Sequence, residues 1–345
     1  MLPIAVIAVS LLCLAAVTSN AAGIQQQAEE LKKRIVNGSG VGQHQYPFAV
    51  RLTTTFNPGS GVFIVCGGTI IAKNAVLTAA HCVQAGESST PVSPSQINVG
   101  AGSSNVGELE QFRVRQVFRH PNYKAQSNQL QGDIAILILE EELPFSDKIN
   151  SINLASGPAN WGVTYQALGY GKTSDGGPLS QQLLSASFRL YSNPVDYCDF
   201  FFPGYGSPSS SVVCFEYDEG SSDFCNGDSG GALVAQGSSG LEIYGISSFG
   251  VTRRSNRRRD LGGPLYERNL DNNRLCGNKN TIDIFTAVYS YRDYINQSIR
   301  SAGPSKPYSG GNNNNNNQGD NNQGDNNNNN NQGQNPDAPH TCACQ

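Results

Sequence analysis

The stretch Asp223-Phe224-Cys225-Asn226-Gly227-Asp228-Ser229-Gly230-Gly231 places a serine between an acid and two glycines. Glycines allow positive φ and a close approach of the backbone to a ligand, so Gly227 and Ser229 are candidates to aim both N–H groups at one point. Two such donors stabilise the oxyanion that forms when a carbonyl is attacked, and Ser229 would be the attacking group. Taken alone, the stretch is equally compatible with an ordinary turn, because these residue types are common in turns.

A serine hydroxyl needs a neighbouring base to take its proton and a third group to orient that base. The chain has four histidines, and one of them, His81, follows an apolar run in Leu77-Thr78-Ala79-Ala80-His81-Cys82. Asp133 stands at the head of the apolar segment 134–139. A carboxylate beside so apolar a strand is costly to bury unless it is hydrogen-bonded, and orienting a histidine would supply that bond.

These three motifs, in the order His, Asp, Ser, resemble those of the trypsin/chymotrypsin family of serine endopeptidases, and the resemblance runs from Ile35 to about Ser301. It implies an all-β fold of two antiparallel β-barrels with a C-terminal helix. It also implies catalysis by His81, Asp133 and Ser229, an oxyanion hole made by Gly227 and Ser229, and no cofactor or metal. Protein or peptide substrates and protein protease inhibitors are the partners expected of such an enzyme.

Composition divides the 345-residue chain into four parts. The apolar run 4–17, followed by small residues, predicts a secretory signal peptide over 1–22 and hence an extracellular protein. Residues 23–34 are polar, and 35–301 form the predicted catalytic domain. Residues 302–345 are rich in Asn, Gln and Gly without an apolar pattern, which predicts disorder. Neither a membrane nor a nucleic-acid partner is expected.

The segment before Ile35 ends in Lys32-Lys33-Arg34. By resemblance, cleavage after Arg34 frees an ammonium group on Ile35 that pairs with Asp228. Breaking one side of a buried ion pair is strongly destabilising, so we expect a zymogen whose oxyanion hole is ordered only after cleavage. The alternative interpretation is an ordinary charged linker.

Nine cysteines are present, of which Cys13 lies in the predicted signal peptide. Six lie in the catalytic region and allow fifteen pairings by sequence alone. The resemblance implies the pairs Cys66–Cys82, Cys198–Cys214 and Cys225–Cys276. Cys342 and Cys344 are left over in the tail. They are candidates to cross-link otherwise monomeric chains, to form a local bridge, or to bind a metal with His340.

In this family the floor of the primary specificity pocket lies six residues before the nucleophile, which is Asp223 here. A carboxylate at that position favours Arg or Lys side chains. The segment Ile246-Ser247-Ser248-Phe249-Gly250 also resembles the brachyurin branch, which places an acid in a segment similar to 282–286. Asp283 would then add a second carboxylate or crowd the pocket; the alternative is an acid at a strand entry that faces solvent.

The same resemblance assigns Phe249 and Gly250 to the edge along which a substrate strand adds, and Ser248 to holding Asp133. The spacing from Gly250 to Cys276 is about twenty residues longer than usual in the family. This insert carries Arg253, Arg254, Arg257, Arg258 and Arg259. It is predicted to be a solvated loop, and the alternative is a patch that binds nucleic acid or heparin. Asn37 and Asn296 begin glycosylation sequons.

β-branched and aromatic content and alternating polarity predict short strands. The predicted ranges are 48–52, 62–65, 75–78, 111–118, 134–139, 165–168, 183–190, 211–215, 232–235, 241–249 and 282–288, followed by a helix over 289–299. The chain is therefore predicted to be a secreted protease that cleaves after Arg or Lys. The alternatives are a broad-specificity brachyurin-like or chymotrypsin-like protease, and a silent protease homologue that acts as a binding protein. Loss of the nucleophile or its base would mark the silent class, and His81 and Ser229 are both present.

Overall fold

A computed structural model provides the structure of the chain. It describes residues 39–57, 59, 61–84, 90–123, 131–174, 176–189, 210–216, 224–253, 266–268, 276 and 281–310. The predictions for the signal peptide, the activation segment, Asn37, Cys198, Asp223 and most of the tail fall outside the described residues. The chain divides into two units, 1–308 and 309–345, and every helix and strand described here belongs to the first.

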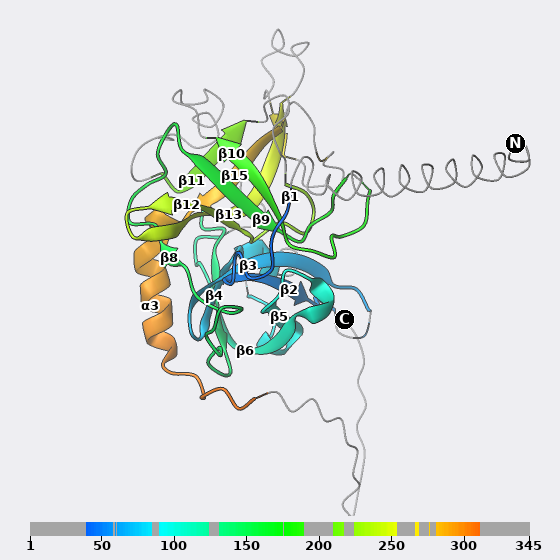
Figure 1. The fold of residues 1–345 in the computed structure, drawn as a ribbon, viewed down its shortest axis with the longest axis vertical. Helices are drawn as coiled ribbons and strands as arrows, with labels where there is room; N and C mark the ends of the chain where they lie inside the picture. The colour runs from blue at the N-terminus through cyan, green and yellow to red at the C-terminus, as the bar shows by residue number, and fades with distance from the viewer. Residues whose placement is uncertain are drawn as a thin grey trace, which may run out of the picture. The chain divides into compact units, whose positions relative to one another are not determined.

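The first half of the fold is a closed antiparallel barrel (Figure 1). Its strands follow the order β2-β3-β4-β7-β6-β5, and β2 pairs with β5 to complete the circle. All five residues of β7 are buried, as expected for a continuously apolar strand, whereas β6 alternates exposed and buried residues near its start. The barrel strands are β2 (Ala49–Thr54), β3 (Ile64–Ala72), β4 (Ala75–Thr78), β5 (Ile97–Ala101), β6 (Glu110–Arg119) and β7 (Ala135–Leu139).

The second half is a nine-stranded sheet whose main path runs β1-β10-β9-β12-β13-β15-β11, with β14 and β8 paired to β13. Phe188 of β10 and Phe215 of β11 pack edge to face, with ring centroids 5.4 Å apart, although their strands are far apart along this path. The sheet therefore curls around its own aromatic core, in agreement with the predicted second barrel. Its strands are β1 (Ser39–Gly40), β8 (Asn153–Leu154), β9 (Thr164–Gly169), β10 (Leu184–Arg189), β11 (Val212–Glu216), β12 (Ala232–Gly237), β13 (Gly240–Arg253), β14 (Tyr266–Arg268) and β15 (Thr281–Ala287).

The predicted C-terminal helix is present, but its predicted start was wrong. Residues Val288–Tyr291 form the 3₁₀ turn η5, and the α-helix α3 follows over Arg292–Ala302. Ile295 of α3 is fully buried in a hydrophobic cluster that contains core residues of the first barrel and of the second half. Other 3₁₀ turns are η1 (Ala80–Val83), η2 (Pro94–Gln96) and η3 (Val106–Glu108). No helix among the described residues has the length and apolar character needed to span a membrane.

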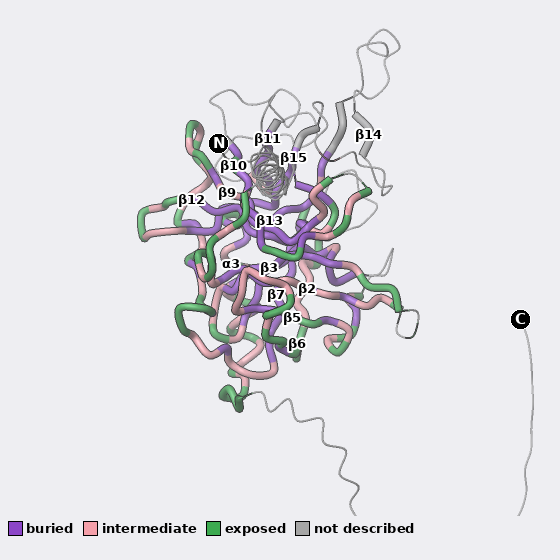
Figure 2. The backbone as a smooth tube through the Cα atoms, turned by 45° about the vertical axis from the view of Figure 1, so that its right-hand side comes forward, coloured by how far each residue is buried: buried purple, intermediate pink, exposed green. Residues whose placement is uncertain are grey.

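Several predicted strands were too short. The strand expected over 62–65 begins at Ile64 and continues through Cys66 to Ala72, and β5 was not predicted at all. β13 continues to Arg253, where it pairs with Tyr266 of β14, so the base of the insert is a β-hairpin rather than a loop. Arg254, Arg257, Arg258 and Arg259 lie outside the described residues. Figure 2 shows that the buried residues follow the strands of both halves, while the connecting turns are a mixture of intermediate and exposed residues.

Two of the three predicted disulfides are confirmed. Cys66–Cys82 joins β3 to η1, and Cys225–Cys276 joins the segment before Ser229 to the region before β15. Cys214 is also disulfide-bonded, and its predicted partner lies outside the described residues. Disulfides of this kind stabilise a fold by about 2–4 kcal/mol, mainly by constraining the unfolded chain.

Candidate active site

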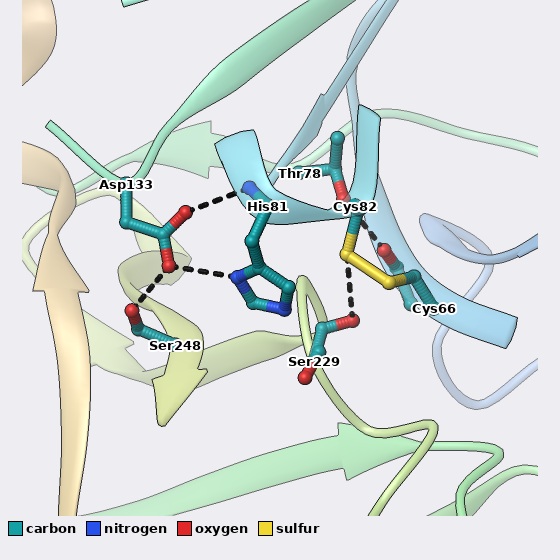
Figure 3. The surroundings of a disulfide bond; sticks show 8 residues. Cys66, Thr78, His81, Cys82, Asp133, Ser229 and Ser248 are labelled. Atoms are coloured by element: carbon teal, nitrogen blue, oxygen red, sulfur yellow. Dashed lines mark hydrogen bonds and ion pairs between the residues drawn. A yellow bond between two sulfur atoms is a disulfide. The ribbon is translucent and has the colours of Figure 1, made fainter. Parts of the chain in front are cut away.

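His81 is presented by the short turn η1, which follows β4 and is anchored by the Cys66–Cys82 disulfide (Figure 3). Its backbone N–H donates to Oδ1 of Asp133 over 3.0 Å, and its Nδ1 lies 2.9 Å from Oδ2. An ionised carboxylate only accepts hydrogen bonds, so Nδ1 carries the proton of this contact. In the neutral imidazole the other ring nitrogen, Nε2, then carries no proton and is the basic nitrogen of the ring.

Asp133 stands just before β7, and its side chain is 3% exposed. Oδ2 also accepts a hydrogen bond from the hydroxyl of Ser248 in β13. Burial alone would raise the pKa of Asp133, but attraction to His81 and the hydrogen bonds from His81 and Ser248 outweigh it and hold this pKa below its usual range. Asp133 therefore stays ionised beside His81.

Ser229 lies on the loop 224–231 before β12, which contacts both halves of the molecule. Its carbonyl oxygen accepts from the N–H of Gly67 in β3 over 2.7 Å, and the N–H of Gly230 donates to Ser247 in β13 over 2.7 Å. Gly227 has φ +100° and Gly230 has φ +79°, conformations that favour glycine. In Figure 3 the ring of His81 presents Nδ1 to Asp133, and Ser229 lies toward its other side.

Cys82 Sγ lies 3.7 Å from the Ser229 carbonyl oxygen. This is a packing contact rather than a hydrogen bond, because the disulfide leaves no thiol proton. Cys66, His81 and Cys82 also lie close enough together to resemble a metal site. Metal binding requires thiolates, and both sulfurs are consumed in the disulfide, so this cluster is not a metal site.

Asp228, next to Ser229, is 2% exposed. Its Oδ1 accepts from the N–H of Gly171 over 2.7 Å, and Oδ2 accepts from the N–H of Cys225 over 2.8 Å. A Cβ at Gly169 would lie 1.9 Å from Oδ1, and one at Gly171 would lie 2.5 Å from Cγ. Two glycines therefore make the space that this buried carboxylate occupies.

Asp283 is 1% exposed in β15 and pairs in register with Gly250 of β13. The alternative interpretation of a solvent-facing acid was therefore wrong. Ser248 and Gly250 are buried and Phe249 is half-buried, all on β13 next to the loop of Ser229. Pairing of β13 with β12 ends at 246 and pairing with β14 begins at 251, so 248–250 lie between the two.

Several neighbours of the site were missed by sequence reasoning. Phe224, directly after Asp223, is buried with its ring 5.2 Å from that of Phe285. Thr286 donates its hydroxyl hydrogen to the carbonyl oxygen of Asp133 over 2.9 Å, and Thr78 donates to the carbonyl oxygen of Gly67 over 2.9 Å. Phe224 and Thr78 lie within the quoted motifs, but their contacts were not predicted, because each contact joins two separate segments of the chain. Asn296 is half-buried on α3, outside this site.

Comparison with known proteins agrees with this geometry. The family model described as Trypsin matches residues 35–265, about two thirds of the chain. Similar proteins include Trypsin 5G1 of Aedes aegypti, 31% identical over 63% of this chain and 75% of the relative, and Trypsin of Saccharopolyspora erythraea, 34% identical over 63% and 86%. Trypsin II-P29 of Gallus gallus is 28% identical over 77% of this chain and 89% of its own length. The chain therefore belongs to the trypsin family of serine endopeptidases.

Proposed function

We propose that this endopeptidase cleaves peptide bonds through an acyl-enzyme formed on Ser229. The Ser229 oxygen attacks the scissile carbonyl carbon while Nε2 of His81 takes the hydroxyl proton. His81 then gives that proton to the leaving amine as the C–N bond breaks. Water, deprotonated by the same nitrogen, hydrolyses the ester and restores the serine. Asp133 keeps the imidazole in the required tautomer and stabilises its charged form.

The observation that carries this proposal is the double contact between His81 and Asp133, made by a ring nitrogen at 2.9 Å and a backbone N–H at 3.0 Å. A carboxylate held this way fixes both the position and the tautomer of a base. Positive φ at Gly227 supports an oxyanion hole formed by the N–H groups of Gly227 and Ser229. Within the described part of the chain, neither of these two N–H groups donates to another backbone group.

We place the primary specificity pocket between the loop of Ser229 and the strands β13 and β15. Asp223 is proposed as its floor and would favour Arg or Lys. Asp283, buried opposite Gly250, is proposed as a second carboxylate in that pocket. The aromatic pair Phe224 and Phe285 favours a second candidate, a broader enzyme that also accepts apolar side chains. Residues 248–250 are proposed as the edge to which a substrate strand adds.

Activation is proposed to follow cleavage between Arg34 and Ile35 in a secreted protein. Asp228 is buried, and an ion pair between a buried carboxylate and the new Ile35 ammonium would be strongly coupled. Asp228 lies between Gly227 and Ser229, so pairing there would order both proposed oxyanion donors. Protein inhibitors that occupy the same substrate edge are expected partners.

A peptide-library profile of the processed enzyme tests the proposal. The protein is expressed with its natural N-terminus, the secreted form is identified by N-terminal sequencing, and cleavage after Arg34 is completed with trypsin that is then inhibited and removed. Hydrolysis mainly after Arg or Lys is expected. If Leu and Phe peptides were hydrolysed as fast as Arg and Lys peptides, the trypsin-like preference would be wrong and the broader enzyme would be supported.

A further inference from the structure

Asp133 precedes a strand of the first barrel, yet three residues of the second half form hydrogen bonds with Asp133 or with Gly132 before it. Ser248 of β13 bonds its carboxylate, and Thr286 of β15 donates to its carbonyl oxygen over 2.9 Å. Tyr291 of η5 accepts from the N–H of Gly132, the preceding residue, over 2.8 Å. We propose that Tyr291, together with Thr286, is a positioning residue that fixes the backbone before and after Asp133. This inference rests on the proposed catalytic role of Asp133.

The backbone at Gly132 needs such an external anchor. Gly132 has φ +76°, and a Cβ there would lie 2.6 Å from Nδ1 of His120, so only glycine fits. Glycine is the least conformationally restricted residue, so the chain itself does little to fix the direction of the following peptide. The Tyr291 hydroxyl supplies a fixed acceptor for its N–H, in a buried setting where an unsatisfied donor would be costly.

The Tyr291 hydroxyl is itself held in place. Its ring packs against His120 with centroids 5.2 Å apart, and Tyr294, one turn further on, packs against the same imidazole at 4.6 Å. The N–H of His120 donates to Ile134 over 3.0 Å, on the other side of Asp133. Tyr291 and His120 together therefore enclose the turn that carries the carboxylate.

The functional consequence concerns orientation. Asp133 must meet two N–H groups of His81 at once, which tolerates little movement of the carboxylate. Displacement of about 1 Å in supporting structure can cost about 10²-fold in rate. Tyr291 has no place in the proposed pocket, so its loss should reduce kcat with little change in KM. A weaker contact with Asp133 also stabilises the His81 imidazolium less, which lowers the pKa of the base and moves the acid limb of the pH–rate profile to lower pH.

Tyr291→Phe tests this inference in the processed full-length enzyme, because it keeps the ring and removes only the hydroxyl. We expect kcat to fall about tenfold, KM to stay within about twofold, and the acid limb of kcat/KM to move to lower pH. Tyr294→Phe is the matched control. It removes a hydroxyl from the adjacent ring on the same imidazole, but that hydroxyl does not bond Gly132. It should behave like the parent enzyme.

Thr286→Val keeps the side-chain shape and removes the hydrogen bond to the Asp133 carbonyl oxygen. The same kinetic measurements are made on it, and it replaces Tyr291→Phe if that variant does not fold. The inference is overturned if kcat changes less than twofold, if kcat falls while the acid limb stays in place, or if Tyr294→Phe has the same effect. If the Ser229→Ala variant were as active as the parent enzyme, the proposed function would be overturned instead. The two failures are therefore distinguishable.

Discussion

The N–H of Gly67 donates to the carbonyl oxygen of Ser229 over 2.7 Å, so a strand of the first barrel directly holds the loop of the proposed nucleophile. There is no room for a side chain at this contact. A Cβ on Gly67 would lie 2.7 Å from the Cα of Gly231 and 2.9 Å from its nitrogen. Both are backbone atoms, so the loop itself would have to move.

Gly67→Ala is therefore expected to reduce kcat by about 10²-fold, because it displaces Ser229 relative to His81. Gly107→Ala is the control, since a Cβ there meets nothing closer than 3.7 Å, at Asn105. Both are assayed on a peptide substrate after processing, with folding checked by circular dichroism. Full activity in Gly67→Ala would show that the contact does not position the nucleophile.

Arg34→Gln should remain inactive after treatment with trypsin, because no Ile35 ammonium is released to pair with Asp228. The variant is compared with the parent protein for N-terminal sequence and for peptide hydrolysis. If uncut Arg34→Gln hydrolyses the peptide as fast as the processed parent, the proposed switch does not exist.

Asp223→Ser should reduce kcat/KM for Arg substrates by at least about 10²-fold while changing Leu or Phe substrates much less, because the ion pair with the substrate is lost. Asp283→Gly is the companion variant that tests the second buried carboxylate. Paired substrates that differ only at the cleaved residue provide the measurement. Equal losses on both substrate types would mean that the pocket floor is misassigned.

His120 should make the protein less stable in mild acid. Burial, and to a lesser degree Arg119, lower the pKa of His120 below its usual value. Protonation therefore favours the unfolded chain, so stability declines as pH falls through the unfolded value of about 6.5 toward the lower folded value. His120→Phe keeps an aromatic ring against Tyr291 and Tyr294 and should show a smaller decrease in Tm over this window.

This comparison is best made in the Ser229→Ala background, which avoids self-digestion. His81 is common to both proteins, so its titration contributes equally to each. An identical decrease in Tm for the two proteins between pH 7 and pH 5 would contradict the assignment to His120.

The motif residues were predictable because each lies in a distinctive local setting. Asp133 heads a continuously apolar strand and His81 follows a largely apolar one, so the sequence alone marks them. Tyr291 and Thr286 were not predictable, because their bonds to the Asp133 turn span 159 and 153 positions of the chain. In the sequence they are not distinguishable from other core and strand residues, because their role depends on how the second half of the fold packs against the first.

The missed part of β3 has a similar cause. Gly67 and Gly68 weigh against a strand interior when only local preference is considered. In the fold, a Cβ on Gly68 would lie 2.9 Å from Val50 and 3.0 Å from Val76, on the neighbouring strands. The glycines are required by close approach between segments, which no local pattern contains. Asp283 likewise resembles a surface acid in the sequence, although it is buried in β15.

Ser229→Ala tests the central claim most directly. The variant keeps every backbone contact of the loop and removes only the oxygen proposed to attack the substrate. Processed wild-type and Ser229→Ala proteins are assayed on the same Arg peptide, with N-terminal sequencing to confirm equal processing by added trypsin, which is then removed. We expect the variant to fold and to lose about 10⁶-fold in kcat, because a catalytic serine and its base act as a unit. Activity within about tenfold of the parent would contradict the mechanism.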